Sequence, residues 1–159
     1  MKAIKAVYNL LINDVDTAAA VTNRIYPVRV PQGLTFPAIV LTQITREANE
    51  TKTGYSITDV ARVQITVLAD TATEAMTIAE LVREAMSPVL PAIYNTIYVS
   101  NIAFLDEQIL IDDDGDELGV FYIAQDYNVH FNNAIVSTGN LLLEDGGFML
   151  LENGDKIIL

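Results

Sequence analysis

One stretch of the chain, residues 58–86, constrains the fold more than any other. Within residues 60–67, apolar side chains alternate with polar ones, the period of an antiparallel strand with one buried face; the apolar positions are Val63, Ile65 and Val67. Residues 71–74 have the spacing of a helix capping box, and apolar residues then recur at helical spacing as far as Met86. The sequence therefore predicts a strand that leads directly into an amphipathic helix, with both apolar faces in one core.

The rest of the chain predicts further strands and one more main helix. Apolar residues share a helical face over residues 2–13, and β-rich segments occur at 38–45, 92–99, 101–105 and 119–131. In the last segment, one face carries Phe121, Ile123, Tyr127, Val129 and Phe131, and the other carries Tyr122, Asp126 and His130. We therefore expect an α+β fold: an antiparallel sheet of about four or more strands, with two main helices packed on one face.

Two connecting segments differ in character. Residues 27–37 contain three prolines, which predicts an extended, rigid connector because proline lacks a backbone donor for a central strand. Residues 46–56 are polar and include Gly54, which predicts a long hairpin loop or a flexible arm between two strands.

The character of the sequence changes after Ser137. A Leu-Leu-Glu-Asp-Gly pentad at 142–146 returns as Leu-Leu-Glu-Asn-Gly at 150–154, and Asp-Gly and Asn-Gly are hairpin-turn signals. We expect a main domain over residues 1–136 and a C-terminal extension over 137–159, either an added strand pair or a mobile tail.

Charge is unevenly distributed along the chain. The net charge is −12. Residues 1–105 carry 9 acidic and 8 basic residues, whereas residues 106–159 carry 12 acidic residues and one basic residue, Lys156. Because affinity for nucleic acid comes mainly from Lys and Arg at the phosphates, this balance predicts repulsion of DNA.

Motifs for catalysis and for metal binding do not emerge. The acidic run at 112–117 has some of the composition of an EF-hand calcium-binding loop. If Gly115 is aligned with the invariant glycine of that loop, Leu110 and Phe121 occupy the first and last positions, where carboxylates are required. The chain has no cysteine and a single histidine, His130, which argues against a zinc site, and no nucleophile elbow accompanies that histidine. The sequence therefore predicts no enzyme activity, no metal and no cofactor.

Several short segments occur in an order that resembles a known family. After the N-terminal helix come Arg24-Ile-Tyr-Pro27, Pro31-Gln32 and Pro37-Ala-Ile-Val40, then the strand Arg62-Val-Gln-Ile65 and an Ala/Met-rich helix. This order, over residues 3–131, resembles the tail completion (tail terminator) proteins of long-tailed bacteriophages and prophages.

The resemblance implies a virion structural protein at the head-proximal end of the tail, made in the host cytoplasm. Members of this family form a hexameric ring that caps the tail tube, ends its growth and presents a surface to the head-side connector protein. The resemblance thus implies as partners further copies of the chain, the tail tube protein and the connector. DNA would pass through the ring without specific binding, which suits walls that repel phosphate.

Five residues are candidates for contacts with other subunits or with the tail tube: Arg24, Tyr26, Glu50, Lys52 and Arg62. Tyr and Arg are enriched at interface hot spots, and residues 46–56 would supply an exposed arm. For each residue, an ordinary packing or surface role is an open alternative. Two other functions also remain open: another neck component, such as a connector or stopper, and a small-molecule-binding domain with a site near His130.

Overall fold

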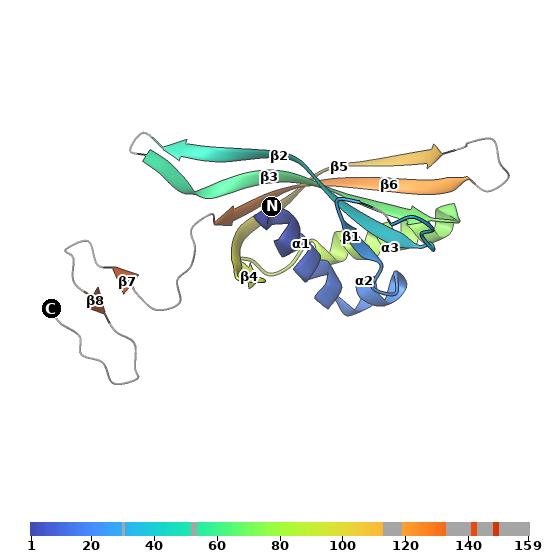
Figure 1. Ribbon diagram of the computed structural model, residues 1–159, viewed down its shortest axis with the longest axis horizontal. Coiled ribbons are helices and arrows are strands. Elements are labelled where there is room, and N and C mark those ends of the chain that lie inside the picture. Colours follow the sequence, from blue (N-terminus) through green and yellow to red (C-terminus); the bar gives the residue numbers. More distant parts are fainter. Residues whose placement is uncertain (30, 52–53, 113–118, 133–140, 143–147, 150–159) are drawn as a thin grey trace.

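The computed structural model describes residues 1–29, 31–51, 54–112, 119–132, 141–142 and 148–149. In this part of the chain, a six-stranded sheet carries its helices on one side (Figure 1). The helices are α1 (Lys2–Asn13), α2 (Val15–Ala20) and α3 (Ala72–Ala85). The strands of this sheet are β1 (Ile25–Pro27), β2 (Ala38–Thr51), β3 (Gly54–Ala69), β4 (Ala92–Tyr94), β5 (Ile97–Asp112) and β6 (Val120–Asn132).

The sheet is mixed, which corrects the expectation of a wholly antiparallel one. Its strand order is β1-β2-β3-β6-β5-β4, and β1 pairs with β2 in parallel, Ile25 opposite Ile39. The connector after Pro27 brings the chain back to the start of β2, so both strands run the same way. The other pairs are antiparallel. The α+β class is confirmed, with the short helix α2 beside the two main helices.

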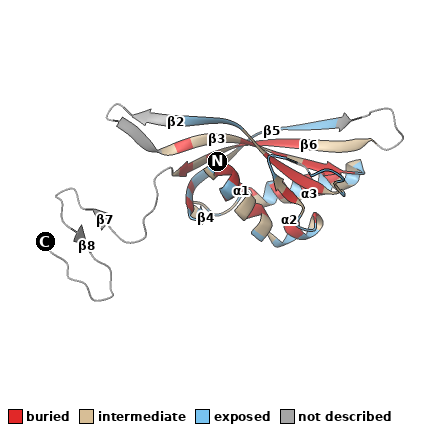
Figure 2. Ribbon diagram, in the orientation of Figure 1, coloured by how far each residue is buried: buried red, intermediate tan, exposed pale blue. Residues whose placement is uncertain are grey.

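One face of the sheet, here called the inner face, packs against the helices. The predicted alternation is confirmed on β3, where Val63, Ile65 and Val67 are fully buried. On β6 the same face is buried from Ile123 to Phe131 (Figure 2). Apolar residues of α1 and α3 complete this core: Ala3, Ile4, Ala6, Val7, Leu10, Leu11, Ala75, Ile78, Ala79 and Val82. The opposite side of the sheet is called the outer face.

Residues 46–51 and 54–56 form strand rather than the predicted loop or arm. β2 continues to Thr51 and β3 begins at Gly54, so the two strands pair along a long hairpin. Figure 1 shows this hairpin extending past the helices, so neither of its faces has a helix to cover. The described residues 46–48 are exposed, so their polar character reflects contact with solvent and not the absence of strand pairing. The ion pair between Arg46 and the buried Asp59 joins the two strands.

The two β-rich segments predicted at 92–99 and 101–105 are divided differently in the structure. Asn95 and Thr96 both have positive φ and form the tight turn of a hairpin between β4 and β5. β5 then continues without interruption to Asp112. Most of the acidic turn predicted at 112–117 lies outside the described residues.

The C-terminal extension is described only at β7 (Leu141–Leu142) and β8 (Phe148–Met149), which pair with each other. The domain boundary after residue 136 stays a prediction. None of the helices in the described residues has the length and apolar character needed to cross a bilayer.

The cap of α3 provides a test of how this helix begins. The Thr71 side chain accepts a hydrogen bond of 3.3 Å from the backbone N–H of Glu74. We expect Thr71→Ala to lower the free energy of unfolding by about 1 kcal/mol, because the N–H group loses its partner. Urea denaturation measures this change. Thr73→Ala, an exposed change in the same turn, is the matched control and should not destabilise; an equal loss in both variants would contradict the capping role.

Candidate functional site

The central strand β6 carries a polar contact on each face of the sheet. It pairs along a seam with β3, from a distant part of the sequence, and Gln64 of β3 lies opposite Asp126 of β6. The outer-face contact is an ion pair between β6 and β3, and the inner-face contact is a hydrogen-bonded network that joins β6 to α3 and β5. The candidate site therefore consists of two surfaces, one on each face of the sheet.

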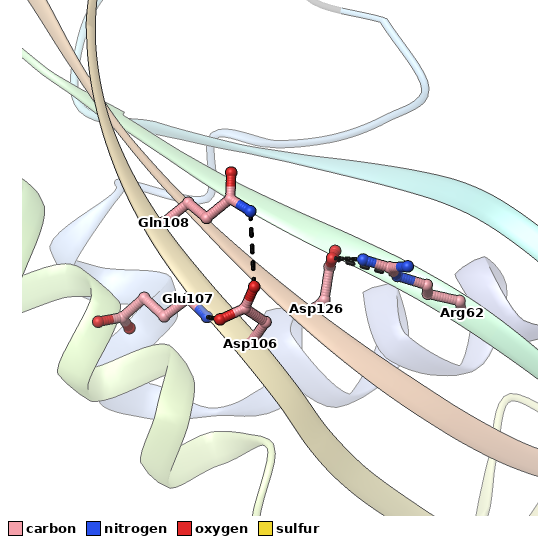
Figure 3. A network of polar contacts seen from close by, with 5 residues as sticks. All are labelled: Arg62, Asp106, Glu107, Gln108 and Asp126. Carbon is pink, nitrogen blue, oxygen red and sulfur yellow. Dashed lines mark hydrogen bonds and ion pairs between the residues drawn. The ribbon is translucent and has the colours of Figure 1, made fainter.

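On the outer face, Arg62 binds Asp126 across the seam (Figure 3). Two guanidinium nitrogens, Nε and Nη2, donate to Oδ2 of Asp126, with the Nε distance at 3.1 Å. The Asp126 side chain is 7% exposed, whereas that of Arg62 is 43% exposed. The sequence placed Asp126 on the face opposite the apolar one, as the structure has it, but did not indicate that its carboxylate is buried and paired.

Acidic groups outnumber basic ones around this pair. Asp106 of β5 lies directly opposite Asp126, and its carboxylate accepts hydrogen bonds from the Glu107 backbone N–H and the Gln108 side chain (Figure 3). Oδ1 of Asp126 is buried and has no hydrogen-bond partner within the described residues. In that part of the chain, no group of three or more His, Cys, Asp or Glu side chains is arranged to hold a metal ion.

On the inner face, Gln125 ties β6 to both α3 and β5. Its Nε2 donates to the carbonyl oxygen of Ala79 at 2.9 Å and to Oε2 of Glu107 at 2.7 Å. Its Oε1 accepts a hydrogen bond of 2.9 Å from the Tyr127 hydroxyl. Sequence reasoning missed Gln125; the available signal was a polar residue between Ile123 and Tyr127 on an otherwise apolar strand face.

A groove opens beside this network, between α3 and β5. It has a volume of about 430 Å³ and is lined by Met76, Ala79, Glu80, Arg83, Phe104, Glu107, Ile109, Ile123 and Gln125. Within it, the Arg83 guanidinium carbon lies 3.5 Å from the centre of the Phe104 ring, the geometry of a cation–π contact. Phe104 in turn meets Tyr127 edge to face. Helix and edge strand are thus linked through side chains at one wall of an open groove.

Burial perturbs one titratable group here. Loss of solvent raises the pKa of Tyr127 to about 12, the Arg83 guanidinium acts in the opposite direction, and the negative charge of Glu107 adds to the rise. His130, the residue named for a small-molecule site, lies on the outer face and is not part of the groove lining.

The predicted contact residues fall at separate places. Arg24 donates through Nε to the Pro37 carbonyl at 2.8 Å and through Nη2 to the Phe36 carbonyl at 3.3 Å, so it ties down the end of the proline-rich connector. Tyr26 is half-buried on β1, opposite Val40. Glu50 lies in β2 opposite Tyr55, and Lys52 lies outside the described residues. The structure does not bring these residues together with Arg62, and their contacts with other chains stay predictions.

The comparisons with known proteins agree with this architecture. A family model, Tail completion protein gp17, matches residues 5–129, which include both main helices and nearly all of the sheet. The chain therefore belongs to the tail completion protein gp17 family and is a phage tail structural protein.

A solved structure shows the same fold. A chain from the virion of a native gene transfer agent particle matches with a TM-score of 0.68 at 20% sequence identity, over 82% of this chain and 94% of that chain. No curated protein sequence matches the chain.

The seam ion pair leads to a stability prediction. We expect Arg62→Leu to destabilise the protein by about 2 kcal/mol, because it leaves the Asp126 carboxylate buried and unpaired; the partial exposure of Arg62 keeps the loss below that of a fully buried pair. Adding Asp126→Leu should recover part of this loss. Urea denaturation of the two single variants and the double variant measures the coupling.

Arg29→Leu, which removes an exposed arginine, is the control and should be nearly neutral. A double variant no more stable than Arg62→Leu alone would show that the carboxylate is not the source of the loss.

The raised pKa of Tyr127 predicts a loss of stability in strong alkali. An unfolded tyrosine ionises near pH 10.0, whereas folded Tyr127 ionises near 12. Below pH 10 the Tyr127 hydroxyl is neutral in both states, and its contribution to the free energy of unfolding is complete. Between pH 10 and 12 the unfolded chain loses this proton first, so the free energy of unfolding falls by about 3 kcal/mol as the pH rises through 12. Unfolding in urea between pH 9 and 12 measures this slope.

Tyr127→Phe should reduce the alkaline slope, and Tyr98→Phe on the exposed part of β5 should leave it nearly unchanged. Equal slopes for the wild type and Tyr127→Phe would contradict the assignment.

Proposed function

We propose that this protein forms a homo-hexameric ring that caps the phage tail tube, ends tube growth and provides the surface to which the head-side connector binds. The observation that carries the proposal is the family match, which covers the helices and sheet as one unit. The role is structural and involves no reaction.

The charge distribution supports a conduit for DNA. The chain carries a net charge of −12. A ring wall of this sign repels phosphate, so DNA can pass without being held. The proposed partners are therefore other copies of the chain, the tail tube protein and the connector, with DNA as passing cargo. The proposed location is the head-proximal end of the tail, after synthesis in the host cytoplasm.

The candidate contact residues differ in whether their side chains already have partners within the chain. Arg62 and Arg24 already hold partners within the chain, so a contact with another subunit must use the exposed part of each side chain. Tyr26, Glu50 and Lys52 are proposed to contact neighbouring subunits or the tube. Any assembly defect of an Arg62 or Arg24 variant must be compared with its change in stability.

Removal of the protein from particle-producing cells tests the function. If the protein ends tube growth, cells that lack it should produce tails of uncontrolled length without heads, and expression of the wild type should restore uniform tails. Electron microscopy measures tail length and head attachment. Tails of normal length that fail to join heads would instead assign the protein to another neck component, such as a connector or stopper.

The mass in solution provides an independent measurement. Light scattering over a concentration series, with and without cognate tail tubes, should show a species of six times the 17.4 kDa subunit. A monomer at every concentration, including in the presence of tubes, would contradict the ring.

A further inference from the structure

We propose that neighbouring subunits join through the edges of their sheets, with β2 of one copy pairing antiparallel with β5 of the next. This inference rests on the proposed ring and names the surfaces that build it. The occupant of each edge is a second copy of the same chain.

Both edges are open along most of their length. β1 covers β2 only at Ile39–Leu41, and β4 covers β5 only at Ile97–Val99. Among the described residues, no strand pairs with β2 over residues 42–48 on the side away from β3, or with β5 over residues 100–110 on the side away from β6. These stretches present unpaired backbone N–H and C=O groups, which are templates for another strand.

Strand direction favours pairing of unlike edges. From β2 through β3 and β6 to β5, every neighbouring pair is antiparallel, so β5 runs opposite to β2. A second copy in the same orientation therefore brings its β2 antiparallel to the first copy's β5, and the alternation continues across the boundary. Because the two edges are different surfaces, the contact is heterologous, which is the kind that closes into a ring.

Exposed apolar side chains are concentrated on these edges. On β5 the exposed large apolar residues are Tyr98, Phe104, Leu105, Ile109 and Leu110, and on β2 Ile44 is 46% exposed. In Figure 2 the C-terminal part of β5, near its label, is coloured mainly as exposed. An apolar surface of this extent on a soluble chain marks a contact site, and burying it against a neighbour would favour assembly.

The groove between α3 and β5 extends the same contact surface on the inner face. This groove is lined by Met76 and Arg83 from α3 and by Phe104 and Ile109 from β5. A strand added beside β5 would place its inner-face side chains against this flank of α3. The groove is therefore assigned to the neighbouring subunit and not to a small molecule.

Each edge strand carries two irregularities in register. They lie on β2 between Gln43 and Thr45 and between Ala48 and Glu50, and on β5 between Val99 and Asn101 and between Phe104 and Asp106. A bulge bends the strand and increases its local twist. Sheets joined through such twisted edges would curve instead of stacking flat, which suits a closed ring.

Cysteine crosslinking tests the pairing directly, because the natural chain has no cysteine. The variants are Ile44→Cys, Leu105→Cys and the two combined, each assembled into tail particles and treated with a short bismaleimide. Within one chain these positions are separated by three strand spacings, roughly 14 Å, and an intrachain link adds no mass. On a denaturing gel, the double variant should give a ladder of covalent multimers, and each single variant should stay monomeric.

The control pairs Ile44→Cys with Val89→Cys, because Val89 is 92% exposed and lies on neither edge; it should give no ladder. Particles that contain the double variant but show no ladder, or dimers from either single variant, would overturn the edge pairing while leaving the tail function intact. Absence of the protein from tail particles would overturn the proposed function as well.

Lysine substitutions on the two edge strands provide a second test, with hexamer formation as the measurement. Ile44→Lys and Leu105→Lys should each prevent hexamer formation while leaving the unfolding transition unchanged, because both side chains are exposed in the single chain. Val89→Lys should assemble as the wild type does. Normal hexamers from both edge variants would contradict the inference.

Discussion

The sheet has one face that must be covered, and the remainder of the fold follows from this requirement. On β3 and β6 every second side chain is apolar and buried, so both strands present the same face to α1 and α3. Because a strand repeats every two residues, a shift of register by one residue would expose this whole set. Gln125 and Asp59 are polar exceptions on this face. Asp59 is paired with Arg46, and the hydrogen bonds of Gln125 to Ala79, Glu107 and Tyr127 satisfy its buried amide and fix α3 over the sheet.

Strand β6 is held to its neighbours by different physical means on the two faces of the sheet. On the outer face, a partly exposed guanidinium covers a buried carboxylate, which gives an electrostatic contact. On the inner face, the hydrogen bonds of Gln125 and the ring contacts of Phe104 join β6, α3 and β5. The β2–β3 hairpin extends beyond the helices (Figure 1), whereas β5 and β6 run beside α3. On the sides away from β3 and β6, β2 and β5 have no partner strand among the described residues along most of their length.

The sequence allowed the central elements to be predicted because their periodicity is strong. The strand and helix over residues 58–86, the helix over 2–13 and the apolar face of 119–131 agree with the structure. The extent of the β2–β3 hairpin was missed, because residues 46–51 are polar and resemble a loop in sequence. The burial of Asp126 depends on Arg62, 64 residues earlier, and no local pattern records such a pair. The turn at Asn95–Thr96 was overlooked within a β-rich run.

The strand order also bears on how the chain folds during synthesis. β2 and β3 form a hairpin from adjacent segments, and β5 and β6 form another, but the seam joins residues 58–69 to residues 121–132. Because the entropy of closing a long loop is lost before the contacts between the hairpins form, we expect docking of the two hairpins to be slower than the formation of either one. Until residue 132 has left the ribosome, the inner edge of β3 is open, and a prematurely ended chain would expose that edge to aggregation.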